Sequence, residues 1–258
     1  MQRLLVIAGS DPSAGAGLQA DLKTAQAFGV YAQTVVTAVT VQDTNGVYGV
    51  ETINPTAVKR QIQVALGDIG ADAVKIGMLG NDAIAASVAD ALNQVSLPMV
   101  LDPVLASSGG RLLLDEKGIE IVKARLLPRA LLVTPNWPEC EALTAIRPEN
   151  DQAVKKVAEA FVRLGARNLL IKGGHGRGAT VRDVLIEAGG RTSIFESPRQ
   201  DTRHTHGTGC VLSSAIASSL AQGKTLVESV RLAHDFVQKA IRTAPGLGSG
   251  HGPLNVVP

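Results

Sequence analysis

Residues 206–210, with the sequence HGTGC, combine two glycines, a hydroxyl and a thiol immediately before a segment of helical periodicity. In residues 211–222 apolar side chains recur at helical spacing, and Gly223 is placed to end that helix. The first N–H groups of a helix lack intrahelical partners and carry partial positive charge, and glycines let a backbone approach a phosphate closely. These residues therefore predict an anion-binding loop. A plain turn capped by Thr205 or Thr208 explains the same pattern, and both interpretations stay open.

Cys210 is the side chain of this loop that is suited to accept a proton or to attack as a nucleophile. A helix N-terminus stabilises a thiolate, so we expect the thiol pKa of Cys210 to lie below its free value of about 8.5. An inert cysteine that packs as a small hydrophobe is the alternative. The other cysteine, Cys140, follows Glu139 in a predicted helical turn and is interpreted as a packing residue.

Six apolar runs have the length and composition of buried strands, and the residues that follow them are mostly polar. In an open parallel sheet the ligand crevice lies beyond the carboxyl ends of the strands, so we expect these residues to share one edge. In chain order they are Ser10-Asp11, Gln42-Asp43, Gly77-Met78, Asp102-Pro103, Asn136 with Glu139, and Lys172-Gly173. Carboxylates, an amide and a lysine together suit a polyphosphate and its magnesium ion. Each single residue is explained as well by a turn or a helix cap, but the set favours ligand binding.

The elements that must hold these residues alternate between strand and helix along the chain. Strands are predicted at residues 3–8, 33–41, 73–76, 98–101, 130–133 and 168–171, and helices at 17–28, 56–66, 83–92, 153–164 and in the final third. Residues 180–197 alternate around Gly189-Gly190, which predicts an antiparallel edge hairpin. The pattern predicts an α/β fold with a mostly parallel central sheet and helices on both faces. With 258 residues, 45% of them hydrophobic, the chain is long enough for a single domain over residues 1–258.

Composition and charge exclude several classes of protein. Lys and Arg number 25 against 23 Asp and Glu, and no basic run is interleaved with aromatic residues, so nucleic acid is not an expected partner. The apolar runs are too short for a signal peptide or a membrane span, and two cysteines do not make a secreted disulfide framework. We therefore expect a cytoplasmic protein with no membrane partner. The histidines lack the spacing of a zinc site.

Two short motifs point weakly to other nucleotide-binding folds. Residues 15–20 match the dinucleotide pattern G-x-G-x-x-A, but residues 10–14 separate them from the strand and no acid occurs at positions 37–40. An NAD(P)-binding oxidoreductase is therefore a remote alternative. Residues 223–225 resemble the end of a P-loop, but Ser218 stands where its first glycine belongs.

The motifs occur in the order found in the hydroxymethylpyrimidine/phosphomethylpyrimidine kinases of thiamine biosynthesis, which the chain resembles almost from end to end. The similarity runs through residues 9–21 (GSDPSAGAGLQAD), 40–44 (TVQDT), 75–79 (KIGML), 102–104 (DPV), 134–136 (TPN), 172–175 (KGGH), 206–210 (HGTGC) and 248–254 (GSGHGPL). The resemblance implies a ribokinase-like three-layer sandwich and a homodimer. It also implies two successive transfers from ATP with Mg²⁺, first to 4-amino-5-hydroxymethyl-2-methylpyrimidine and then to its monophosphate.

The resemblance also implies a role for individual residues. The pyrimidine is expected to contact Gln42, Asp11, Gly17, Met78 and Val104. The nucleotide is expected at Lys172, Asn136 and Thr205, and Mg²⁺ at Asp102 and Glu139. The transfer centre comprises Gly207, Thr208, Gly209 and Cys210, with Cys210 where sugar-kinase relatives carry an aspartate base. We hypothesise that Cys210 matters more for the first transfer, because the second starts from a phosphate that is already ionised.

Two further interpretations are kept. A pyridoxal kinase of the same branch is the nearest one, because pyridoxine also carries a hydroxymethyl group on a small heteroaromatic ring. A non-catalytic nucleotide sensor would bind ATP without turnover, but Asp102, Glu139 and Cys210 together favour chemistry.

Overall fold

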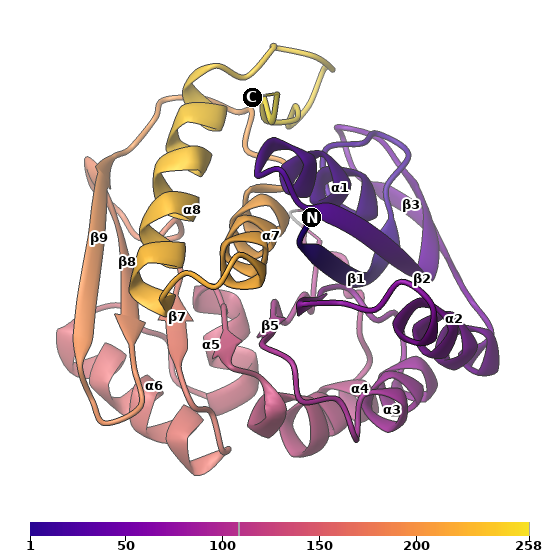
Figure 1. The fold of residues 1–258 in the computed structure, drawn as a ribbon. Coiled ribbons are helices and arrows are strands. Elements are labelled where there is room, and N and C mark those ends of the chain that lie inside the picture. The colour runs from indigo at the N-terminus through magenta and orange to yellow at the C-terminus, as the bar shows by residue number, and fades with distance from the viewer. Residues whose placement is uncertain (108, 258) are drawn as a thin grey trace.

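A single mixed β-sheet forms the centre of the molecule (Figure 1), in a computed structural model that describes residues 1–107 and 109–257. Within these residues nine strands lie in the order β3-β2-β1-β4-β5-β6-β7-β8-β9. Their bounds are β1 (Arg3–Ser10), β2 (Tyr31–Gln42), β3 (Val47–Thr52), β4 (Ala73–Ile76), β5 (Met99–Leu101), β6 (Leu132–Val133), β7 (Leu169–Ile171), β8 (Thr180–Ile186) and β9 (Thr192–Pro198). The strands from β2 to β7 in this order run parallel, whereas β3 at one edge and β8 and β9 at the other pair antiparallel.

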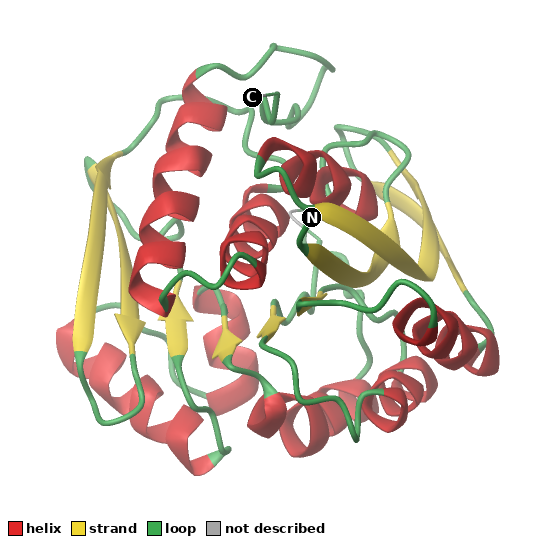
Figure 2. Ribbon diagram, viewed as in Figure 1, coloured by secondary structure: helices red, strands yellow, loops and turns green. Residues whose placement is uncertain are grey.

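Helices cover both faces of the sheet, as the red ribbons of Figure 2 show. One face carries α2 (Pro55–Gly67), α3 (Asp82–Ala91), α4 (Glu116–Ile121), α5 (Trp137–Thr144) and α6 (Asp151–Arg163), and the other carries α1 (Gly17–Ala27), α7 (Thr208–Ala221) and α8 (Leu226–Arg242). Side chains of β1 alternate between the two layers, with Leu5 and Ile7 in the first core and Leu4 and Val6 in the second. The molecule is therefore a three-layer sandwich.

The helix α7 is buried along almost its whole length. Residues 211–221 are all buried, because α7 lies against the sheet and between α1 and α8. Small side chains allow this close approach, namely Ser213, Ser214, Ala215, Ala217, Ser218 and Ser219. The burial fixes α7 firmly, so the residues at its N-terminus are held in place at the edge of the sheet.

The main elements of this fold were predictable from the sequence. The predicted strands and helices occur close to their expected bounds, and the β8–β9 hairpin turns at Gly189 and Gly190, whose φ angles are 91° and 86°. The strand β3 was missed because its half-exposed residues, with Gly49 among them, alternate only weakly. The six-residue helix α4 was missed because it is too short to show a helical period. Across the described ranges, none of the helices combines the length and the apolar character that a membrane crossing requires.

Candidate active site

The HGTGC loop leads directly into α7, which begins at Thr208 with Gly207 as its N-cap. Gly207 has a φ of 83°, and a Cβ atom there would collide with the carbonyl oxygen of Gly15, so only glycine fits. No side chain caps this helix, and Oγ1 of Thr208 donates instead to the carbonyl oxygen of Thr205, 3.0 Å away. The alternative of a turn capped by either threonine is therefore wrong.

The first turn of α7 has N–H groups available for an anion. The N–H of Thr208 makes a long bond of 3.3 Å to Thr205, and regular intrahelical bonding begins with Val211. Within the described part of the chain, the N–H groups of Gly209 and Cys210 make no hydrogen bond to backbone or side chain. Unpaired donors at a helix N-terminus favour a bound phosphate, so the geometry supports the anion-binding interpretation.

A second helix N-terminus meets the first at Cys210. The helix α1 begins at Gly17 without a side-chain cap, and the backbone N–H of Gly17 lies near enough to the thiol to favour its ionised form. Burial nevertheless raises the pKa of Cys210 to about 11. The ammonium group of Lys75 opposes this rise, whereas the carboxylates of Asp21 and Asp102 add to it. The expected lowering of the Cys210 pKa is therefore wrong, because burial and two nearby carboxylates outweigh the helix N-termini.

Lys172 lies between two carboxylates. Its Nζ is 2.7 Å from Oδ1 of Asp102 and 3.7 Å from Oε2 of Glu139, and all three side chains are largely buried. Asp102 follows β5, Lys172 follows β7 and Glu139 lies in the first turn of α5. Burial alone would lower the pKa of Lys172, but the two carboxylates outweigh burial and raise the pKa above its ordinary value. The amine therefore stays charged beside the free N–H groups of α7.

The two carboxylates differ in their charge near neutral pH. Burial would raise the pKa of Asp102, but the ammonium groups of Lys172 and Lys75 hold the pKa below its ordinary value. At Glu139 burial dominates and raises the pKa to about 7, although Lys172 opposes the rise. Asp102 is therefore ionised at neutral pH, whereas Glu139 is close to its titration point.

Asn136 and Glu139 also have a structural role. The Oδ1 of Asn136 accepts from the N–H of Glu139 at 2.9 Å, and the N–H of Asn136 donates to Oε2 of Glu139 at 2.7 Å. This capping box starts α5, which bears out the helix-cap interpretation for this pair. The Nδ2 of Asn136 and the Oε1 of Glu139 take no part in the capping box. Further along α5, Cys140 is fully buried in the core, as the sequence predicted.

The donor set fits a magnesium ion that arrives with a nucleotide. Residues 1–107 and 109–257 contain no group of three or more His, Cys, Asp or Glu side chains able to hold a metal ion. In phosphoryl transfer, however, Mg²⁺ is commonly held by one or two carboxylates together with substrate phosphates and water. Asp102 and Glu139 meet that requirement in number and in chemical type.

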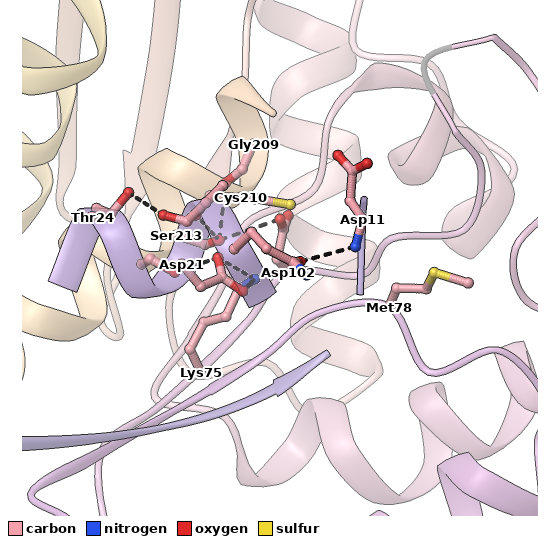
Figure 3. A network of polar contacts seen from close by, with 12 residues as sticks. Asp11, Asp21, Thr24, Lys75, Met78, Asp102, Gly209, Cys210 and Ser213 are labelled. Carbon is pink, nitrogen blue, oxygen red and sulfur yellow. Dashed lines mark hydrogen bonds and ion pairs between the residues drawn. The ribbon is translucent and has the colours of Figure 1, made fainter. Parts of the chain in front are cut away.

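The residues predicted to form the walls of the substrate pocket lie in one small apolar cluster. Met78 and Val104 pack there with Ala38 and Leu113. Met78 follows β4, and Val104 follows β5 by three residues. In Figure 3 the side chains of Met78, Asp11 and Cys210 lie in one region at the ends of these strands.

Gln42 and Asp11 meet through a histidine that sequence analysis left without a role. The Nε2 of His206 is 2.8 Å from Oδ2 of Asp11 and 3.2 Å from Nε2 of Gln42. Of the other predicted residues, Gly17 lies near the thiol of Cys210, and Thr205, which directly precedes the HGTGC loop, is exposed.

A buried ion pair beneath Cys210 was missed altogether. The Nζ of Lys75 is 2.8 and 3.0 Å from the two carboxylate oxygens of Asp21, and both side chains are 0% exposed. Ser214 of α7 donates a 2.6 Å hydrogen bond to the same carboxylate, so the pair joins α1, β4 and α7 below Cys210 (Figure 3). The available signal was a lysine inside the short apolar run predicted as a strand at residues 73–76.

Comparison with curated proteins gives relatives along the whole chain. The hydroxymethylpyrimidine/phosphomethylpyrimidine kinase of Haemophilus influenzae is 41% identical over 259 residues, covering 99% of this chain and 96% of that protein. A thiamine biosynthesis bifunctional protein of Geobacter sulfurreducens is 43% identical over 253 residues, but this chain spans only 51% of its length.

Solved structures agree with these relatives. An ADP complex of Bacillus subtilis pyridoxal kinase has a TM-score of 0.90 at 32% identity and covers 98% of this chain and 96% of that chain. A phosphomethylpyrimidine kinase of Clostridium difficile has a TM-score of 0.82 at 38% identity and covers 93% and 100%. The fold is therefore that of the ribokinase-like kinases, as the resemblance implied. Residues 11–255 match the family described as phosphomethylpyrimidine kinase, and the chain belongs to that family.

Proposed function

We propose that the protein transfers the terminal phosphoryl group of ATP to 4-amino-5-hydroxymethyl-2-methylpyrimidine and then to its monophosphate, as a step of thiamine biosynthesis. The observation that carries this proposal is the meeting of two uncapped helix N-termini, those of α1 and α7, beside Lys172. The curated relatives named for this activity share about 40% of their residues with the chain over nearly its whole length. The proposal includes a single domain, as the chain length favours, a cytoplasmic location, as the composition favours, and a homodimer, which the resemblance implies.

The protein would accelerate the transfer mainly by position and charge. The N–H groups of Gly209 and Cys210, with the ammonium of Lys172, are placed to neutralise charge on the transferred phosphoryl oxygens. Gly207 makes this approach possible because it has no side chain. Asn136 and Thr205 would contact the nucleotide from the adjoining loops. Such groups act without reorganising, since burial and hydrogen bonds already hold them in place.

Asp102 and Glu139 would hold Mg²⁺ when the nucleotide brings it. The ion would supply positive charge that offsets the negative charge of the phosphates. Lys172, which lies between the two carboxylates, would keep them oriented toward the phosphates. Removal of Mg²⁺ with a chelator should abolish turnover, and Mg²⁺ should restore it.

On the acceptor side, Gln42 would hydrogen-bond the pyrimidine between walls formed by Met78 and Val104. Cys210 would accept the hydroxyl proton in the first transfer. Because burial raises the thiol pKa to about 11, this role requires the thiol to lose its own proton first. The second transfer, to a phosphate that is already ionised, would not require it. Cys210→Ala should therefore slow the first transfer more than the second.

The decisive experiment is a coupled ADP-release assay with Mg·ATP and three acceptors in parallel, namely the hydroxymethylpyrimidine, its monophosphate and pyridoxal. We expect turnover of the first two. Pyridoxal kinase is the second candidate, because solved pyridoxal kinases superpose with a TM-score of 0.90. Turnover of pyridoxal alone would overturn the pyrimidine assignment. Binding of ATP without turnover of any acceptor would favour a nucleotide sensor.

A further inference from the structure

His206 connects two residues that face the acceptor side of the site. It is only 8% exposed, and its Nε2 contacts both Asp11 and Gln42. The carboxylate of Asp11 already accepts hydrogen bonds from the N–H and Oγ of Ser13 and from the N–H of Ala16, at 2.8 to 2.9 Å. Burial alone would raise the pKa of Asp11, but the hydrogen bonds from His206 and Ser13 lower the pKa below its ordinary value.

An ionised carboxylate can only accept hydrogen bonds, and this determines where the imidazole carries its hydrogen. The Nε2 of His206 lies 2.8 Å from Oδ2 of Asp11, so Nε2 must be the protonated nitrogen, with its hydrogen directed at that oxygen. The same nitrogen then has no lone pair to offer to Gln42. This holds for the neutral imidazole and for the imidazolium alike.

The other neighbour of the Gln42 amide imposes a matching requirement. Thr40 is buried, and its Oγ1, which has one hydrogen to donate, lies 3.0 Å from the carbonyl oxygen of Ser10 and 3.2 Å from the Gln42 amide atom placed as Oε1. When that hydrogen goes to Ser10, the nearer acceptor, the Thr40 oxygen is free to accept from the Gln42 amide. Both contacts are then satisfied when the amide oxygen of Gln42 shares the Nε2 hydrogen of His206 with Asp11 and the amide nitrogen donates to Thr40. The opposite orientation places two donors against each other at His206, and Thr40 can then donate to Gln42 only by giving up its hydrogen bond to Ser10.

We propose that His206 is a positioning residue for acceptor recognition, which fixes the Gln42 amide with Oε1 toward the imidazole and Nε2 toward Thr40. The consequence for acceptor recognition rests on the proposed function, whereas the orientation of the Gln42 amide rests only on its contacts. Gln42 is only partly buried, so the second N–H of its amide remains available. An amide with a fixed orientation has its N–H donor on one known side and its oxygen acceptor on the other. An aminopyrimidine edge has a ring nitrogen acceptor beside an amino donor, so it pairs with the amide in only one of the two orientations.

The imidazole and the backbone of His206 pack closely against two glycine-rich segments. A Cβ atom on Gly15 would collide with the ring of His206, and the N–H of His206 donates to the carbonyl oxygen of Gly252 at 3.2 Å. Gly252 belongs to the glycine-rich tail, which also hydrogen-bonds Thr44, two residues after Gln42, through the N–H of His251 at 2.7 Å. Two glycine-rich segments thus enclose His206 from opposite ends of the chain.

The tautomer is the first test, and it needs neither substrate nor activity. Long-range proton–nitrogen NMR on histidine-labelled protein reports which ring nitrogen carries hydrogen, and His206→Gln identifies the signal. We expect a protonated Nε2, together with nuclear Overhauser contacts from the Gln42 amide protons to the methyl group of Thr40. An unprotonated Nε2, or contacts from those protons to the imidazole instead, would overturn the proposal even if the protein proves to be the expected kinase.

Kinetics supply the second test, with two variants at one position. His206→Gln keeps an N–H donor where Nε2 lies, whereas His206→Leu removes it. In the leucine variant we expect KM for the pyrimidine to rise about tenfold, as for one lost hydrogen bond, with KM for ATP and kcat little changed. The glutamine variant should recover most of the loss. Equal defects in both variants, or a fall in kcat alone, would contradict the positioning role.

A matched control is available within the chain. His234 of α8 is a second buried histidine that contacts a carboxylate, Asp183 of β8, at 3.3 Å, six strands away from β2 in the sheet order. His234→Leu should alter stability but leave KM for the pyrimidine unchanged. An increase there equal to that of His206→Leu would show that general loosening, and not the Gln42 amide, causes the effect.

Discussion

Substitution of Lys75 by methionine would remove the positive charge of a fully buried ion pair and keep most of the side-chain volume. The carboxylate of Asp21 would then lie at 0% exposure with the hydroxyl of Ser214 as its remaining hydrogen-bond donor. Breaking a buried pair on one side leaves an uncompensated charge, which typically costs about 3–5 kcal/mol. For a chain of this size each kcal/mol lowers the melting temperature by about 2–4 °C, so we expect a fall of roughly 6–20 °C.

The double variant Lys75→Met/Asp21→Leu separates the charge from the packing. Replacing both partners of a buried pair by apolar groups removes the desolvation penalty together with the attraction, so we expect the double variant to regain at least half of the loss. Thermal and urea unfolding, followed by circular dichroism, would measure both variants. Arg3→Met is the matched control, because the Arg3–Asp72 pair has a similar N–O distance of 2.7 Å but lies at the surface. We expect little change there.

A specific result would refute this reasoning. If Lys75→Met were as stable as the wild type, the carboxylate of Asp21 would have to be neutral or hydrated, and the pair would not be a buried salt bridge. If the double variant regained none of the stability lost in Lys75→Met, the uncompensated charge of Asp21 would not be the cause of that loss, contrary to the desolvation argument.

Three further predictions concern the transfer centre. Gly209→Ala places a Cβ atom 3.2 Å from Nζ of Lys172, so we expect kcat/KM for ATP in steady-state assays to fall by up to about 10²-fold. Gly67→Ala is the control, because a Cβ there meets nothing within 4 Å and should leave kcat/KM unchanged. Lys172→Met should reduce kcat by about 10²- to 10³-fold in the ADP-release assay with little loss of pyrimidine binding, and an unchanged kcat would exclude a role in transfer. Iodoacetamide reacts with the thiolate form of a cysteine, and with a pKa of about 11 the thiolate fraction of Cys210 rises about tenfold per pH unit from pH 8 to 10. Mass spectrometry of a Cys140→Ser variant should therefore show the alkylation rate rising by the same factor. A rate that is already independent of pH at pH 8 would show that the pKa is not raised.

The relative position of Lys172, Asp102 and Glu139 could be predicted because it follows from topology. In a parallel sheet the carboxyl ends of adjacent strands share one edge, so residues that follow β5 and β7 meet without any information on side-chain packing. The observed separations of 2.7 and 3.7 Å agree with that expectation. The periodicity of the strands was therefore sufficient to find this part of the site.

Contacts between distant segments could not be predicted in the same way. His206 and Asp11 are 195 positions apart, and Lys75 and Asp21 are 54 apart, so no spacing rule connects either pair. The lysine within a strand gave a signal, but its partner depends on how α1 packs on the sheet. The cap of α7 was equally hidden, because the close approach of Gly15 excludes any side chain at position 207.

The misjudged pKa of Cys210 has a physical consequence for the site as a whole. A helix N-terminus is a local feature and suggests a thiolate, whereas burial and the carboxylates of Asp21 and Asp102 are contributed by the tertiary structure. A thiolate at this point would place a negative charge beside the N–H groups that are free to bind a phosphate, and the two anions would repel each other. A pKa of about 11 keeps the thiol neutral at physiological pH, so the positive potential of both helix N-termini and of Lys172 stays available to a bound anion. The same shift that makes Cys210 a poor resting nucleophile therefore favours the binding of an anion next to it.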